Sequence, residues 1–394
     1  MLSFFKPYIK EEEKSNVINY KYKGGDTSIF YVLCMAPLCD WLTPKFPEWL
    51  APNVITISGF FFNLTYFLLT FYYNGFGGGN ILPPWVCYLS AFLYFSHCVL
   101  DNCDGRQARR TKASSPLGLL VDHGTDACTT FFITCGLGNF VYYEKLDQYL
   151  YVYIMITVAF FLNTWEEYYT GELILPIIHG VSEGMLLIVI IEVLSGLYNV
   201  KIFNYKIILF NGFINSRLKD LIGIAGMFAG IFFGVVSLFK VLRFVGWKKF
   251  PRALFDVIIY IIFLSSLLCV NCFANTNFIE TAPRLIICSY GLLFAKMMGL
   301  LQLSHIKNST FNPYILSIMT PILVQMFHSL YFYYYKVELF FSTDNMICFF
   351  FCWNFISWAH FVYFCSEELC EILNIKRFSL GKRHPEIKDE KKKI

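Results

Sequence analysis

The sequence predicts an all-α, polytopic membrane protein with about ten transmembrane helices. Composition is the first reason: of 394 residues, 56% are hydrophobic and only 15% are charged, against roughly 25% charged in an average soluble domain. The second reason is local, because residues 51–100 contain no Asp, Glu, Lys or Arg. So little polar surface cannot cover so much apolar side chain in water, and a bilayer is therefore the predicted environment.

Apolar stretches of about 20 residues, the length that crosses a bilayer as a helix, recur along the whole chain. The predicted spans cover residues 54–74, 84–101, 116–142, 148–170, 184–200, 221–241, 254–273, 284–304, 313–334 and 345–366. Before the first of them, residues 27–50 mix Trp and apolar side chains with Pro, Asp and Lys. That mixture favours a segment lying in the membrane interface.

The stretch from Asp101 to Asp126 interrupts this apolar pattern with regularly spaced aspartates. The pattern is D-x2-D-G-x2-A-R-x8-G-x3-D-x3-D, and its fixed residues are Asp101, Asp104, Gly105, Ala108, Arg109, Gly118, Asp122 and Asp126. Carboxylates at the edge of an apolar span are costly unless they bind something positive. Divalent metal ions are the expected partners, and metal ions held in this way commonly bind phosphates.

Helical spacing brings these carboxylates together. Asp101 and Asp104 are one turn apart at the end of one predicted span. Asp122 and Asp126 lie four residues apart near the start of the next, in a stripe that begins at Gly118. Four oxygen donors that face one another suit one or two Mg²⁺ or Mn²⁺ ions, so all four aspartates are candidate metal ligands.

The other fixed residues suit a nucleotide diphosphate. Gly105, Ala108 and Gly118 are small and let a ligand approach the backbone, and Arg109 suits a bidentate contact with a diphosphate. The alternative is a buried network of salt bridges, in which the four acids offset the bases of the same stretch. Those bases are Arg106, Arg109, Arg110 and Lys112.

At every fixed position the pattern resembles the signature of CDP-alcohol phosphotransferases. Further stretches resemble the eukaryotic choline/ethanolaminephosphotransferase branch of that family, although the match thins after about residue 200. They are Trp49-Leu-Ala-Pro-Asn53-Val-Ile-Thr56, Gln107-Ala-Arg-Arg110, Ser115-Pro-Leu-Gly118, Asp122-His-Gly124, Trp165-Glu-Glu-Tyr168 with Thr170, Val181-Ser-Glu-Gly184 and, more weakly, Phe294-Ala-Lys296 with His305.

The resemblance implies that phosphocholine and/or phosphoethanolamine is transferred from CDP-choline or CDP-ethanolamine to diacylglycerol, with release of CMP. It also implies Mg²⁺ or Mn²⁺, two ions in all, a six-helix catalytic core and a homodimer. The expected regions are a cytosolic N-terminus and interfacial segment (1–50), the catalytic core (51–242), further helices for dimerisation or lipid access (243–366) and a basic cytosolic tail (367–394).

Lys and Arg predict the orientation of the chain. They are enriched in both terminal segments and in the loop 102–115, which an even number of spans places on one side, so these parts are expected to face the cytosol. The loop 201–219 also carries bases and runs against the rule. The final Lys-Lys-Lys-Ile resembles an endoplasmic-reticulum retrieval signal, which favours the endoplasmic reticulum membrane, with the Golgi as the alternative.

The proton acceptor for the diacylglycerol hydroxyl has two candidates. Asp126 is the family's traditional choice, but a carboxylate that coordinates metal is a weak base. His123 marks the choline/ethanolamine branch, and an imidazole titrates near neutral pH. His123 is therefore the favoured base; the alternative is a histidine that merely orients Asp122.

Two further assignments follow from the resemblance. Asn53, after Pro52, is a candidate nucleotide contact, although its position equally fits a helix N-cap. A quaternary ammonium group suits an aromatic cage, for which Trp165, Glu166 and Tyr168 are tentative candidates.

Competing functions are another head group or acceptor on the same chemistry and, in a different class, a cation-coupled transporter. A transporter is expected to spread its acids near the middle of the membrane, with broken helices in paired halves. Nucleic acid is not an expected partner, since the net charge is only +4 and no basic stripe with interleaved aromatic residues appears.

Overall fold

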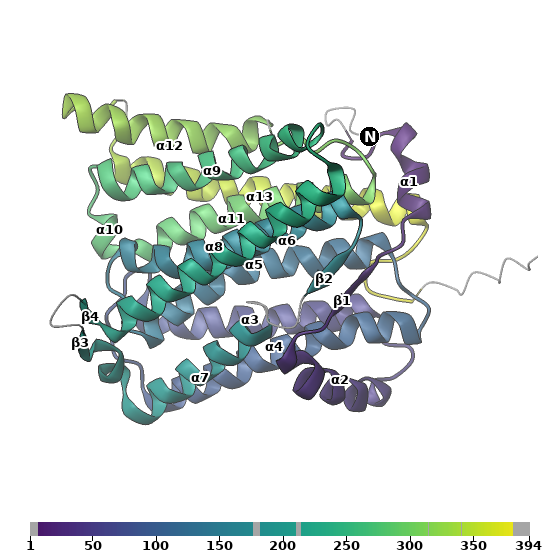
Figure 1. Ribbon diagram of the computed structural model, residues 1–394, viewed down its shortest axis with the longest axis horizontal. Helices are drawn as coiled ribbons and strands as arrows, with labels where there is room; N and C mark the ends of the chain where they lie inside the picture. Colours follow the sequence, from purple (N-terminus) through teal and green to yellow (C-terminus); the bar gives the residue numbers. More distant parts are fainter. Residues whose placement is uncertain (1–6, 176–181, 210–213, 314, 340, 381–394) are drawn as a thin grey trace, which may run out of the picture.

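The computed structural model of the protein describes residues 7–175, 182–209, 214–313, 315–339 and 341–380. Within these residues ten long helices lie side by side with similar axis directions (Figure 1). They are α3 (Pro52–Asn74), α4 (Pro84–Arg110), α5 (Pro116–Phe140), α6 (Leu146–Thr170), α7 (Ser182–Tyr198), α8 (Leu218–Val245), α9 (Phe250–Phe273), α11 (Pro283–Ile306), α12 (Leu316–Tyr335) and α13 (Thr343–Leu373).

Each of the ten predicted spans falls on one of these helices, which confirms the all-α, polytopic architecture. By length and composition alone, six helices in the described part of the chain are apolar enough to cross a membrane: α3, α6, α8, α9, α11 and α13. Among the rest, α4 and α5 carry the charged motif, and α7 has only 17 residues.

Proline and glycine set several helix boundaries. Pro52, Pro84 and Pro116 each occupy the first turn of a helix, where the missing N–H costs no hydrogen bond and the fixed φ is already helical. The Ser115 hydroxyl caps α5 by accepting from the backbone N–H of Gly118 at 3.1 Å. At the C-terminal end of α6, Gly171 adopts φ +80°, a left-handed conformation that glycine tolerates without strain.

The aspartate motif is more helical than the sequence predicted. The predicted loop 102–115 is helical as far as Arg110, so only residues 111–115 connect α4 to α5. Hydrogen bonds on its outer side hold this extension: Arg106 binds the backbone oxygen of Asn102 and the carboxylate of Asp40, both at 2.8 Å. Asp101 and Asp104 therefore lie on one continuous helix.

Short elements cover the end of the bundle that carries the motif (Figure 1). Segment 27–50 is largely helical and packs against α4, as predicted for a segment outside the spans; its place in the membrane interface stays a prediction. The short elements at this end are a 3₁₀ turn (Glu11–Glu13), α1 (Lys14–Asn19), a π-helical turn (Tyr31–Met35), α2 (Ala36–Leu42) and a 3₁₀ turn at Thr43–Lys45. A further 3₁₀ turn, Val200–Asn204, follows α7 and contacts α7 and α8.

Two small sheets and one short helix complete the described structure. Strand β1 (Gly24–Asp26) pairs in parallel with β2 (Leu173–Leu175), which ties the N-terminal segment to the chain after α6. Strands β3 (Lys206–Leu209) and β4 (Ile214–Arg217) form a hairpin at the opposite end, and α10 (Phe278–Thr281) precedes α11.

The helices differ sharply in how much protein covers them. In the apolar stretch of α11, 94% of the residues are buried inside the protein, whereas in that of α8 only 22% are. Helix α11 is thus an internal helix that packs on α5, α6 and α13, and α8 lies at the surface. Of the sequence predictions, Val181 and the Lys-rich end of the basic tail, residues 381–394, lie outside the described residues.

Candidate active site

Three of the four motif aspartates converge from two helices. Carboxylate oxygens of Asp101 on α4 and of Asp122 and Asp126 on α5 all lie within 4.8 Å of one another. One oxygen of Asp101 is buried without a hydrogen-bond partner among the described residues. Like charges this close repel one another unless a cation or a shared proton lies between them, and this donor set and its geometry fit a divalent ion.

Asp104 lies beside this group. It is buried, and its Oδ2 accepts a 2.5 Å hydrogen bond from the hydroxyl of Thr56 on α3. Its charge interacts with those of Asp122 and Asp126. Because its oxygens fall outside the set of three, Asp104 borders the cluster with one oxygen already engaged.

The basic side chains of the motif turn away from the acids. Arg106 pairs with Asp40, and Arg110 binds the backbone oxygens of Thr43 and Phe46. Among the described residues, none of the four aspartates forms a salt bridge with Lys, Arg or His. The described contacts therefore contradict a salt-bridge network in this stretch: two of its four bases, Arg106 and Arg110, bind the interfacial segment instead.

The predicted nucleotide contacts lie on α3, α4 and α5, the last two being the helices that carry the aspartates. Gly105 and Gly118 both have room above the backbone: an added Cβ would meet Arg109 at 3.6 Å in the first case and Asn53 at 3.4 Å in the second. Arg109 is exposed and Ala108 lies beside it on α4. The Asn53 amide does not cap its helix; it donates at 2.8 Å to the backbone oxygen of Arg377 in the C-terminal segment.

A second cluster lies around His123, one residue beyond Asp122. The Nδ1 of His123 is 3.9 Å from one carboxylate oxygen of Glu167 on α6, and the Nε2 of His305 on α11 is 3.8 Å from the other. Gln302, one turn before His305, donates to Glu167 at 3.5 Å and also interacts with His123. Glu167 is 1% exposed, so these neutral partners are what compensates its burial.

The N-terminal segment covers this second cluster. The Tyr20 ring packs edge-on against His305, with centroids 5.3 Å apart. Burial and the nearby charge of Glu167 raise the pKa of Tyr20, so its phenol stays protonated. Half-exposed Tyr22 lies near the charges of Asp122, Glu167 and Arg109, so it stands over both clusters.

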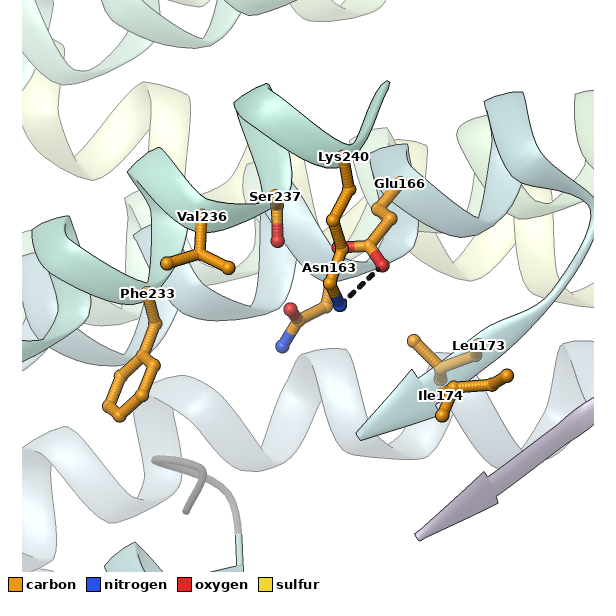
Figure 2. A pocket seen from close by; sticks show the side chains of 8 residues that line it. All are labelled: Asn163, Glu166, Leu173, Ile174, Phe233, Val236, Ser237 and Lys240. Carbon is orange, nitrogen blue, oxygen red and sulfur yellow. Dashed lines mark hydrogen bonds and ion pairs between the residues drawn. The ribbon is translucent and has the colours of Figure 1, made fainter. Parts of the chain in front are cut away.

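The three tentative head-group residues have separate partners. The Trp165 indole donates to the backbone oxygen of Ala253 at 3.2 Å, and the Tyr168 hydroxyl binds the backbone of residues 309 and 311. The Glu166 side chain instead points to α8, where its carboxylate pairs with Lys240 at 2.8 Å (Figure 2). The structure does not gather the three into one aromatic cage.

Sequence reasoning did not single out Glu167 or Gln302, and it noted His305 only as part of a resemblance. A usable signal existed for Glu167, because an acid inside an apolar span is a functional candidate. Gln302 had none, since a neutral side chain 135 residues away from Glu167 meets it only through the fold.

The sequence is similar to known proteins of one family. The sequence profile of CDP-alcohol phosphatidyltransferase matches residues 49–209. Choline/ethanolaminephosphotransferase 1 of Arabidopsis thaliana is 31% identical over 310 residues, 76% of this chain and 79% of that protein. An uncharacterized class-I CDP-alcohol phosphatidyltransferase of Dictyostelium discoideum is 29% identical over 377 residues, 95% of each chain. Ethanolaminephosphotransferase 1 of Mus musculus is 38% identical over 193 residues, 45% of this chain and 46% of its own.

The site and the fold thus define a transferase built on a helical membrane core with an aspartate cluster at one end. The chain belongs to the CDP-alcohol phosphatidyltransferase family.

Proposed function

We propose that this protein transfers phosphocholine and/or phosphoethanolamine from the CDP-alcohol to diacylglycerol, producing phosphatidylcholine or phosphatidylethanolamine and CMP. The observation that carries the proposal is the convergence of Asp101, Asp122 and Asp126 within 4.8 Å at the end of two apolar helices. This arrangement needs a cation, and family membership supplies the substrate class to which that cation is matched.

The four motif aspartates are the proposed metal ligands. We propose that they bind two ions, either Mg²⁺ or Mn²⁺. A divalent ion, when bound there, neutralises the diphosphate and stabilises charge on the leaving group. Asn53, Gly105, Ala108, Arg109 and Gly118 are the proposed nucleotide contacts. Arg109, which is exposed beside Gly105, is suited to orient the diphosphate.

His123 is the proposed proton acceptor. The hydroxyl oxygen of diacylglycerol attacks the phosphorus that carries the alcohol, the bond from that phosphorus to the CMP oxygen breaks, and the hydroxyl proton passes to the imidazole. The Glu167 carboxylate, 3.9 Å from His123, is placed to stabilise the imidazolium that forms. Asp126, the alternative base, stands among the other carboxylates and serves better as a ligand.

A radiolabel assay tests this function. Purified protein in detergent receives diacylglycerol with CDP-choline or CDP-ethanolamine, with and without EDTA. Labelled phospholipid that depends on added Mg²⁺ or Mn²⁺ supports the proposal, and the ratio of the two products assigns the head group. Folded protein with no product from either donor contradicts it and points to another CDP-alcohol or acceptor.

Further properties are proposed on family grounds and on the distribution of Lys and Arg. They are a homodimer, residence in the endoplasmic reticulum membrane and an active site that faces the cytosol. Mass photometry of the detergent complex checks the dimer. Protease accessibility of residues 27–50 in sealed microsomes checks the orientation, since a lumenal site would leave this segment protected.

A further inference from the structure

A groove of about 600 Å³ lies between the ends of α6 and α8, on the face of α6 that carries Glu166. A narrower recess continues along α8 past Ser237 and Val236 to Phe233 (Figure 2). This groove is separate from the candidate active site, because Glu166 contacts α8 whereas its neighbour Glu167 faces α5 and α11. The residues that line the groove are Glu166, Thr170, Glu172, Ile174, Lys240, Arg243 and Phe244.

The position of the groove along the helices matches the boundary of a membrane. Lys240 lies five residues before the end of α8 and Glu166 four residues before the end of α6, which is about 6–8 Å along each axis. The polar layer of a bilayer leaflet is about 5–8 Å deep. The charged mouth of the groove therefore sits at head-group depth, and Val236 and Phe233 lie one and two turns deeper.

Lipid has direct access to this groove. Little protein covers α8, and its outer side chains Phe232, Phe239 and Phe244 are each at least 60% exposed. A helix with large apolar side chains exposed on a membrane protein faces acyl chains. The recess toward Phe233 has room for only about one water molecule, so the acyl chains of a bound lipid lie along the exposed outer face of α8.

The groove is lined by equal numbers of acidic and basic side chains, and the two kinds come from different elements. Two acids, Glu166 and Glu172, come from the α6 side, and two bases, Lys240 and Arg243, come from α8. Glu166 is 6% exposed and bound to Lys240, whereas Glu172 and Arg243 are both exposed. A ligand with an anion and a cation a few bonds apart satisfies both sides, whereas a purely anionic ligand leaves the Glu172 carboxylate uncompensated beside it.

We propose that this groove binds the head group of a zwitterionic glycerophospholipid, with its phosphate on Arg243 and Lys240 and its ammonium group toward Glu172. Arginine at this position provides the bidentate donor that phosphate prefers. The class of lipid is that of the product, a connection that rests on the proposed function; the binding itself rests only on the groove.

Native mass spectrometry of the full-length protein in detergent tests the proposal. The protein is titrated with dioleoyl phosphatidylcholine, dioleoyl phosphatidylglycerol and dioleoylglycerol. Phosphatidylcholine is expected to bind most tightly, and Arg243→Ala to weaken it about tenfold, the effect of one charge-assisted hydrogen bond. Lys248→Ala removes an exposed base just beyond α8 and outside the groove, and is expected to leave the affinity unchanged.

A second variant tests the charge arrangement itself. Glu172→Gln removes the exposed acid, so it is expected to shift the preference from phosphatidylcholine toward phosphatidylglycerol. The paired change Glu166→Leu with Lys240→Met removes the buried Glu166 charge together with its partly exposed partner Lys240, which avoids leaving either charge unpaired. Equal binding of phosphatidylglycerol and phosphatidylcholine by the unmodified protein overturns the proposal, as does an Arg243→Ala variant with unchanged affinity.

The same preparations separate this proposal from the proposed function. Binding with the expected pattern in a protein that transfers nothing from either CDP-alcohol leaves the lipid site standing and removes the function. Conversely, metal-dependent transfer in a protein whose phosphatidylcholine affinity is unchanged by Arg243→Ala supports the proposed function and removes the lipid site.

Discussion

Two clusters of buried polar side chains lie at the same end of the helix bundle, and they differ in the partners of their carboxylates. In the aspartate cluster, Asp101, Asp122 and Asp126 face one another, and no base of the described chain pairs with them. In the glutamate cluster, a single buried acid, Glu167, stands between His123 and His305 with Gln302 beside it. The two clusters are adjacent on α5, because His123 directly follows Asp122.

This difference indicates two tasks. Three carboxylates within 4.8 Å repel one another strongly in a medium of low dielectric constant, so they favour a bound cation. One carboxylate beside imidazoles is instead an arrangement that holds and moves a proton. The two proposed roles, charge neutralisation and proton transfer, thus fall on adjacent residues of α5, and substitutions should separate them.

The largest expected effect is in the aspartate cluster. Asp122→Asn keeps the size of the side chain but removes one charged ligand, so we expect kcat to fall about a thousandfold, a loss of several kcal/mol of charge stabilisation. Binding of Mn²⁺, followed by electron paramagnetic resonance, should weaken in parallel. The control is Asp147→Asn, an exposed acid at the opposite end of the bundle; equal losses in both variants would contradict a metal-ligand role.

The next effect separates the proton acceptor from the ligands. His123→Ala should lower kcat about 10²–10³-fold, the usual contribution of a general base, while Mn²⁺ binding stays near that of the unmodified protein. Full activity in this variant, together with loss of activity in an Asp126→Asn variant that still binds metal, moves the base to Asp126. Turnover and metal binding must therefore be measured on the same samples.

A smaller effect is expected at Glu167, which acts through His123. Glu167→Gln retains the size and the hydrogen bond with Gln302 but cannot stabilise an imidazolium, so kcat should fall about 10–100-fold with KM for the CDP-alcohol unchanged. Glu144→Gln, an exposed acid at the far end, is the matched control. A rise in KM without a change in kcat would indicate a substrate contact instead of a positioning role.

The aspartate cluster was predictable because its geometry is local. Spacings of three and four residues place side chains on one helical face, and only the crossing of α4 with α5 had to be assumed. The ten helices were predictable for a similar reason, since about 20 apolar residues have one structure in a bilayer. Even there, the extension of α4 to Arg110 depended on partners such as Asp40 that lie outside the motif.

The glutamate cluster was not predictable, because it is assembled from three helices. Glu166 and Glu167 are adjacent and alike in type, and the 100° between successive residues of a helix sends one to Lys240 and the other to His123. Which face of α6 meets α11 is decided by tertiary packing. The same reason explains why Trp165, Glu166 and Tyr168, grouped in sequence, find separate partners.

The smallest effect concerns Asn53, which contacts the C-terminal segment. Its amide donates to the backbone oxygen of Arg377 while its oxygen borders Gly118, so it either contacts the nucleotide or only holds the tail. Asn53→Ala is expected to raise KM for the CDP-alcohol about fivefold, the value of one hydrogen bond.

A chain that ends at Ile375 separates the two roles, because it removes the acceptor at Arg377 and keeps the Asn53 amide. If Asn53 contacts the nucleotide, this truncation should leave KM unchanged or lower it, since the amide is freed for the substrate. If Asn53 only holds the tail, truncation and Asn53→Ala should raise KM equally. The comparison therefore decides whether the C-terminal segment competes with the substrate at the aspartate cluster or supports it.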